Sequence, residues 1–143
     1  MKNIFMLGLL LLIVSNLQAQ CEDYQSAMSD VLSYADDCSS YVKKAYNANN
    51  LEDAQYYAKI AMNSADDAMS SASDAQSYAS DCDCDDGENY ASNARSNADD
   101  AYSYAKKAYN ADKLEDAQYY AKKAKSSAED CEGEASSGEY ECD

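Results

Sequence analysis

The chain has 143 residues, of which 11 are basic and 27 acidic, with no histidine, no proline and a formal net charge of −16. So acidic a surface repels phosphate backbones and anionic lipid head groups and attracts cations or basic proteins. We therefore expect neither nucleic acid nor an anionic membrane surface as a partner. The absence of histidine, of a glycine-rich phosphate loop and of a recognisable nucleophile setting also argues against an enzyme.

Residues 1–19 have the layout of a secretory signal peptide, with one lysine, an apolar run over 4–14 and a short polar exit that ends in Ala19. The apolar run is too short to span a membrane. Lipid anchoring at Cys21 is disfavoured, because a lipoprotein signal places a small residue before the cysteine and Gln20 is not small. We expect a periplasmic or extracellular chain with ten basic and 27 acidic residues, a formal charge of −17.

Small residues spaced alternately by three and four predict helices, each with one coiled-coil-like stripe that we call a seam. A seam of alanines lets antiparallel helices approach closely, but each buried methyl contributes only about 0.8 kcal/mol. The four seams are Tyr24, Ala27, Val31, Ala35, Cys38, Val42 and Ala45; Ala54, Ala58, Ala61, Ala65, Ala68, Ala72, Ala75 and Ala79; Ala91, Ala94, Ala98, Ala101, Ala105 and Ala108; Ala117, Ala121, Ala124, Ala128, Cys131 and Ala135. They predict helices over residues 22–47, 50–80, 89–110 and 113–131.

One passage of the chain, Tyr41 to Ala61, recurs as Tyr104 to Ala124 with 17 identical positions. We call the shift that places Tyr41 on Tyr104 the repeat offset. This duplication predicts an all-α fold of two antiparallel helical hairpins, packed as a four-helix up-down bundle or as a short helical-repeat stack. The expected parts are a four-helix domain over 20–131, made of hairpin one (22–80), a loop (81–88) and hairpin two (89–131), followed by an acidic flexible tail (132–143).

Both copies break the seam at a turn, and residues after each break suggest a capping box. Asn49 pairs with Glu52 in the first copy and Asp112 with Glu115 in the second. We therefore expect these side chains to bond the exposed amides at the starts of the second and fourth helices.

Two resemblances support this architecture. The segments around the turns, with Ala54, Ala58 and Ala61 at small-residue positions, resemble the centre of a tetratricopeptide repeat, a peptide-binding helical family. The repeat offset is much longer than the period of about 34 residues in that family, and the family's proline is missing here. The alanine pattern is also similar to a small periplasmic family of metal-binding helical hairpins, whose histidine ligands have no counterpart in this chain. Both resemblances imply helical hairpins only.

Six cysteines in a secreted chain predict disulfides. Cys21 is expected to pair with Cys82 or Cys84 and Cys142 with the other, because these positions lie at one end of an up-down bundle. Cys38 and Cys131 then remain, at seam positions about 10 Å apart in height unless the helices are staggered. A thiolate metal site is the alternative.

The segment between the hairpins is rich in carboxylates, as calcium loops are. Its acids are Asp81, Asp83, Asp85, Asp86 and Glu88, but the glycine and glutamate positions of an EF-hand are not matched. A solvated acidic loop and a weak Ca²⁺ site are both open interpretations, and no other cofactor is expected.

The two copies differ most in a set of apolar residues of hairpin one, whose counterparts in hairpin two are mainly charged. The set comprises Met28, Leu32, Ile60, Met62 and Met69. It is either an exposed patch that binds a protein partner or a second copy of the chain, or a surface covered by hairpin two or the tail. We expect a non-enzymatic, disulfide-stapled interaction or scaffold protein, with an acidic calcium binder as the alternative.

Overall fold

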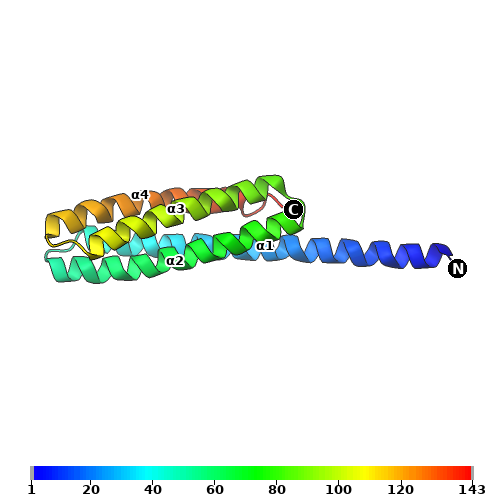
Figure 1. Cartoon of the computed structure of the whole chain (residues 1–143), viewed down its shortest axis with the longest axis horizontal. Helices are drawn as coiled ribbons and strands as arrows, with labels where there is room; N and C mark the ends of the chain where they lie inside the picture. The colour runs from blue at the N-terminus through cyan, green and yellow to red at the C-terminus, as the bar shows by residue number, and fades with distance from the viewer. Residues whose placement is uncertain (1, 143) are drawn as a thin grey trace.

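The computed structural model describes the backbone of residues 2–142 and the side chains of residues 19–142. Four helices, α1 (Lys2–Tyr46), α2 (Leu51–Asp81), α3 (Asp85–Tyr109) and α4 (Leu114–Gly138), run up and down side by side (Figure 1). Each packs against the next, and α4 closes the ring against α1. The chain is therefore an all-α four-helix bundle with one shared core, and not a repeat stack.

The four predicted seams form the core. None of their residues is more than 7 % exposed, and the described residues include no buried polar or charged side chain. Most of the core residues are alanines, whose small side chains let the helices approach closely. The largest fully buried side chains are Tyr24, Met28, Val31, Val42, Cys38 and Cys131.

Two predicted boundaries are wrong. The loop expected over 81–88 is only a short turn, because α3 begins at Asp85; the acids in its first turn favour the positive N-terminal end of the helix dipole. The tail expected over 132–143 is helical as far as Gly138, and Cys142 is buried beyond it. The seam continues into both segments, since Gly87 of α3 and Ala135 and Gly138 of α4 are buried.

The capping residues also differ from the prediction by one position. Helix α2 begins at Leu51, so Asn50 is its N-cap, and the Asn50 side chain accepts a 2.8 Å hydrogen bond from the Asp53 amide. The matching position of α4 is Lys113, which has the same extended backbone and no side-chain cap bond. The boxes expected at Asn49 and Asp112 are therefore not formed.

Two equivalent hydrogen bonds join the hairpins. The Gln55 side chain of α2 donates to the carbonyl of Ala111 in the second turn, and Gln118 of α4 donates to Ala48 in the first turn, each at 2.9 Å. The two donors are related by the repeat offset and so are the two acceptors, so the bundle has an approximate internal two-fold axis. These bonds also place the end of α3 beside the first turn of α2, and the end of α1 beside that of α4.

The predicted leader lies largely outside the described residues, since no side chain before residue 19 is described. Its backbone continues α1 beyond the α2–α3 end of the bundle (Figure 1). Among the residues that the structure describes, no helix is both long enough and apolar enough to cross a membrane.

Candidate functional site

The apolar set of hairpin one does not form one exposed patch. Met28 is fully buried, and Leu32, Ile60, Met62 and Met69 are half-buried. Met28 reaches Gly138 of α4, where an added Cβ would lie 2.9 Å from its terminal carbon. The expected exposure of Met28 is therefore wrong, because α4 covers it.

Two members of the set lie at the two interfaces that join the hairpins. Met28 faces α4, whereas Met69 lines a shallow groove with Arg95 of α3. Each follows a seam residue by one position, and both lie on the side of hairpin one that faces hairpin two. The open alternative in which hairpin two covers these residues is the one that the packing supports.

The acids between the hairpins are not gathered into a cation site. Asp81 ends α2, Asp83 occupies the turn with φ 56°, and the other three lie in the first turn of α3. Within the described part of the chain, no three His, Cys, Asp or Glu residues are grouped so that they could hold a metal ion.

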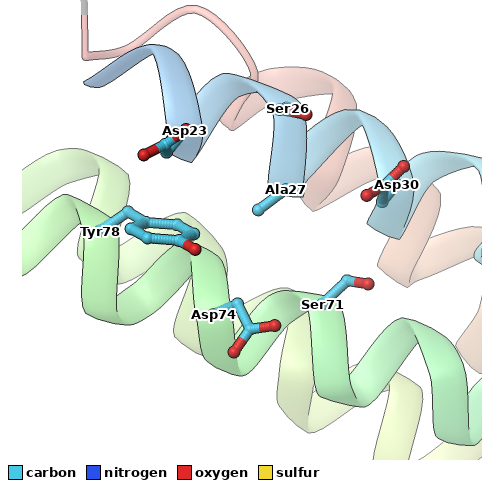
Figure 2. Close-up of a pocket in the computed structure, with 7 residues that line it drawn as sticks. All are labelled: Asp23, Ser26, Ala27, Asp30, Ser71, Asp74 and Tyr78. Atoms are coloured by element: carbon cyan, nitrogen blue, oxygen red, sulfur yellow. The ribbon is translucent and has the colours of Figure 1, made fainter. Parts of the chain in front are cut away.

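A second acidic feature is a groove between α1 and α2. Figure 2 shows Asp23 and Asp30 on α1 opposite Asp74 and Tyr78 on α2, with two serines among the lining residues. The groove is open to solvent, and its carboxylates are exposed. Its chemistry is that of a solvated acidic surface.

One end of the bundle is held together by a disulfide, and we call it the cysteine end. Here α1 enters the bundle, α2 turns into α3, and α4 ends. Cys84 and Cys142 form a disulfide there, which agrees with the predicted pairing of Cys142 with one of the two adjacent cysteines. Cys21, Cys38, Cys82 and Cys131 are free thiols in this structure.

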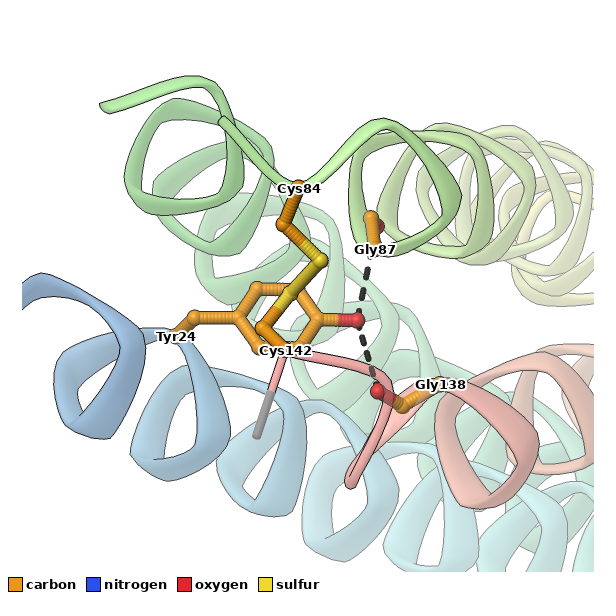
Figure 3. The surroundings of a disulfide bond; sticks show 5 residues. All are labelled: Tyr24, Cys84, Gly87, Gly138 and Cys142. Atoms are coloured by element: carbon orange, nitrogen blue, oxygen red, sulfur yellow. Dashed lines mark hydrogen bonds between the residues drawn. A yellow bond between two sulfur atoms is a disulfide. The ribbon is translucent and has the colours of Figure 1, made fainter. Parts of the chain in front are cut away.

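Tyr24 organises the cysteine end. Its buried hydroxyl donates to the Gly138 carbonyl at 2.7 Å, and the Gly87 carbonyl lies 3.4 Å away (Figure 3). Burial and the nearby Glu141 carboxylate raise the pKa of the Tyr24 phenol, so it remains a donor. A Cβ on Gly87 would lie 2.8 Å from Cys84 Sγ and 3.1 Å from Tyr24 Cζ, so only glycine leaves room for both.

The opposite end, where both turns lie, carries most of the exposed aromatic surface. We call it the turn end and define it as residues 41–61 and 104–124, the two copies of the duplicated passage. Among the described side chains, five large apolar residues are exposed, and four of them are here: Tyr46, Tyr56, Tyr109 and Tyr119. Tyr56 and Tyr119, at matching positions, are 60 % and 56 % exposed.

Lysines lie over tyrosine rings of the turn end. Lys44 Nζ is 4.3 Å from the Tyr41 ring centroid, and its repeat counterpart Lys107 is 4.9 Å from that of Tyr104. Lys123 lies 5.5 Å from the Tyr119 centroid. Such cation–π contacts hold an ammonium group against the ring while leaving it hydrated.

Charge is strongly segregated along the bundle. The turn end contains eight lysines and five acids, a net charge of +3, whereas the rest of the chain from residue 20 onward contains two basic residues and 22 acids, a net charge of −20. The prediction from the overall charge therefore missed a locally basic, aromatic surface. A charge count on each copy of the duplicated passage would have found it, once the fold had placed both copies at one end.

The chain matches no protein-family model, no curated protein and no solved structure.

Proposed function

We propose that the chain is a secreted, non-enzymatic helical protein that binds an acidic protein surface through its turn end. The observation that carries the proposal is the coincidence of four exposed tyrosines with a net charge of +3 on a bundle that is otherwise strongly acidic. Tyrosine combines a rigid apolar ring with a polar hydroxyl, which suits it to protein interfaces.

Local charge decides which partner this end attracts. Helix α4 has 25 residues and is therefore about 37 Å long. The Debye length at physiological ionic strength is about 8 Å. An acidic segment docked at the turn end is thus screened from the distant carboxylates and interacts with the lysines beside it. The acidic remainder of the surface is where cations or basic proteins would associate.

An NMR titration provides a direct test. Tyrosine emission can follow the same titration, because the chain has no tryptophan that would mask it. The probe is a synthetic peptide of glutamate and glycine, titrated into the mature ¹⁵N-labelled protein in low salt. We expect saturable amide shifts confined to residues 41–61 and 104–124, which weaken as NaCl is added. Shifts centred on the cysteine end, or no saturable shift, would contradict the proposal.

Two pairs of variants separate a specific surface from general charge. Tyr56→Ser with Tyr119→Ser should weaken peptide binding about tenfold, whereas Tyr140→Ser, which alters an equally exposed ring at the cysteine end, should leave it unchanged. Lys59→Glu with Lys123→Glu should abolish binding, and Arg95→Glu should have a small effect. If the unmodified protein sediments as an oligomer without any peptide and the lysine variant sediments as a monomer, the acidic partner is a second copy of the chain.

A further inference from the structure

We propose that the exported chain carries two disulfides in addition to Cys84–Cys142, namely Cys21–Cys82 and Cys38–Cys131, so that all six cysteines are paired. The proposal depends on the expected export of the chain to an oxidising compartment and is independent of the partner proposed for the turn end.

The first pair is in contact at the cysteine end. Cys82 is the C-cap residue of α2 and is 7 % exposed, and Cys21 on α1 packs against the same buried cluster, where the two thiols interact. The two thiols are therefore neighbours that oxidation can join. A Cys21–Cys82 bond would close the open end of hairpin one.

The internal two-fold axis supports this pair independently. Cys21 and Cys84 are related by the repeat offset, and Cys142 comes shortly before the position that would match Cys82. The observed Cys84–Cys142 bond closes the open end of hairpin two. Cys21–Cys82 is therefore the same closure in the other copy.

The second pair lies in the centre of the bundle. Cys38 on α1 and Cys131 on α4 are each 1 % exposed, and both line one internal space that has no room for a water molecule. The glutamine bonds show that the helices are staggered, which reduces the height difference expected for straight, level helices. The lining residues form four pairs related by the repeat offset: Ala35 and Ala98, Cys38 and Ala101, Ala65 and Ala128, Ala68 and Cys131.

The burial of this pair also indicates when it would be oxidised. Desolvation raises the pKa of both Cys38 and Cys131 to about 12, so a folded, reduced chain has almost no thiolate at these positions. Since the thiolate is the attacking species, the bond would form while the core is still closing, and would then be protected from reductants.

The chemistry is thiol–disulfide exchange with a disulfide oxidant, either a disulfide-bearing oxidoreductase or oxidised glutathione. One cysteine thiolate attacks the oxidant and forms a mixed disulfide, releasing the first thiol of the oxidant. The second cysteine thiolate then attacks the mixed disulfide and releases the other. Each new bond transfers two electrons and two protons from the cysteine pair to the oxidant.

Peptide mapping tests the connectivity. The protein is exported with its leader, purified without reductant, alkylated in denaturant and digested with two endoproteinases, one that cuts before aspartate and one that cuts after glutamate. The first separates Cys82 from Cys84 at Asp83, and the second separates Cys131 from Cys142 at the glutamates between them. We expect no alkylated cysteine, an intact mass about 6 Da below that of the reduced chain, and linked peptides for both proposed pairs. Alkylation of Cys38 or Cys131, a deficit of about 2 Da, or a Cys21–Cys84 link would overturn the proposal.

Thermal melts distinguish crosslinking from packing. The variant Cys38→Ala/Cys131→Ala carries the residues found at the symmetry-related positions 101 and 68, so it should fold. We expect its Tm to be lower than that of the unmodified protein by at least about 10 °C without reductant, and nearly equal to it when both proteins are first reduced in denaturant and then refolded and melted with reductant. Cys21→Ala/Cys82→Ala should behave in the same way. Equal losses with and without reductant would mean that the thiols only fill space, and would refute the proposal.

Discussion

Single residues decide how well each helix of this bundle begins. Asn50 caps α2 with its side chain, whereas Lys113 stands at the same position of α4 and leaves the first amides uncapped. A positive charge at a helix N-terminus is also unfavourable for the helix dipole. The near-identical copies thus contain one optimal and one poor helix start.

The cap difference predicts a stabilising substitution. Lys113→Asn should raise the free energy of unfolding by about 1 kcal/mol, because the Lys113 backbone already has the extended conformation that a cap requires. Asn50→Lys should lower it by a similar amount. Urea denaturation followed by circular dichroism measures both. No gain from Lys113→Asn, alongside a clear loss from Asn50→Lys, would mean that α4 begins elsewhere.

Glu132 is a second residue with a local effect on stability. Its Oε1 atom is buried without a hydrogen-bond partner. Desolvation and then Asp36 raise the pKa of its carboxyl, while Ser39 partly opposes the shift. The matching residue of hairpin one is Met69, which suits the same interface without charge.

Glu132 therefore predicts a pH effect of definite sign. A carboxyl with a raised folded-state pKa is harmless below its unfolded-state pKa, and destabilises the fold progressively as pH rises through the folded-state pKa. Glu132→Gln should therefore raise stability by about 1 kcal/mol at neutral pH and by little below about pH 4. Melts of both proteins across this range test it; an equal gain at every pH would show that ionisation is not the cause.

At the level of elements, the duplicated passage joins the two hairpins as well as forming their turns. Gln55 and Gln118 each bond the carbonyl of the opposite turn. Each copy therefore supplies both a donor and an acceptor to the other. Met28 of hairpin one also lies where the hairpins meet, and there it contacts the small Gly138.

The two glutamine hydrogen bonds predict that removing either side chain lowers stability by a similar amount. Gln55→Ala and Gln118→Ala should each lower the free energy of unfolding by about 1 kcal/mol, because each leaves a carbonyl without its partner. The double variant should lose about the sum. Gln76→Ala, on the same helix as Gln55 but with no side-chain hydrogen bond in the described structure, is the matched control. A loss from the control as large as from Gln55→Ala would attribute the effect to helix packing alone.

At the scale of the whole molecule, charge and a thin core act together. The chain buries mainly methyl groups, and outside the turn end it carries a net charge of −20. Repulsion among these carboxylates destabilises the compact state. The Cys84–Cys142 disulfide at the cysteine end opposes unfolding in the acidic part of the bundle.

The repulsion among the carboxylates predicts that salt stabilises the protein. Raising NaCl from about 0.01 M to about 1 M shortens the Debye length from about 30 Å to about 3 Å and should raise Tm by several degrees at pH 7. The same series at about pH 4, near the carboxyl pKa values, should show a much smaller effect. A Tm that falls with salt at pH 7 would mean that attractive ion pairs dominate.

The sequence alone determined the helices, their inward stripes and their antiparallel order, because a spacing of three and four residues fixes one face of a helix. It also predicted that Cys142 bonds Cys82 or Cys84 at one end of the bundle, as the Cys84–Cys142 disulfide confirms. It misplaced the start of α3 and the end of α4, since local acidity does not reveal whether a seam continues. Only the tertiary structure decided which surfaces are exposed: it covered Met28 with α4 and brought both copies of the basic passage to one end. Spacing within a helix is set locally, but exposure depends on which neighbouring helix lies opposite.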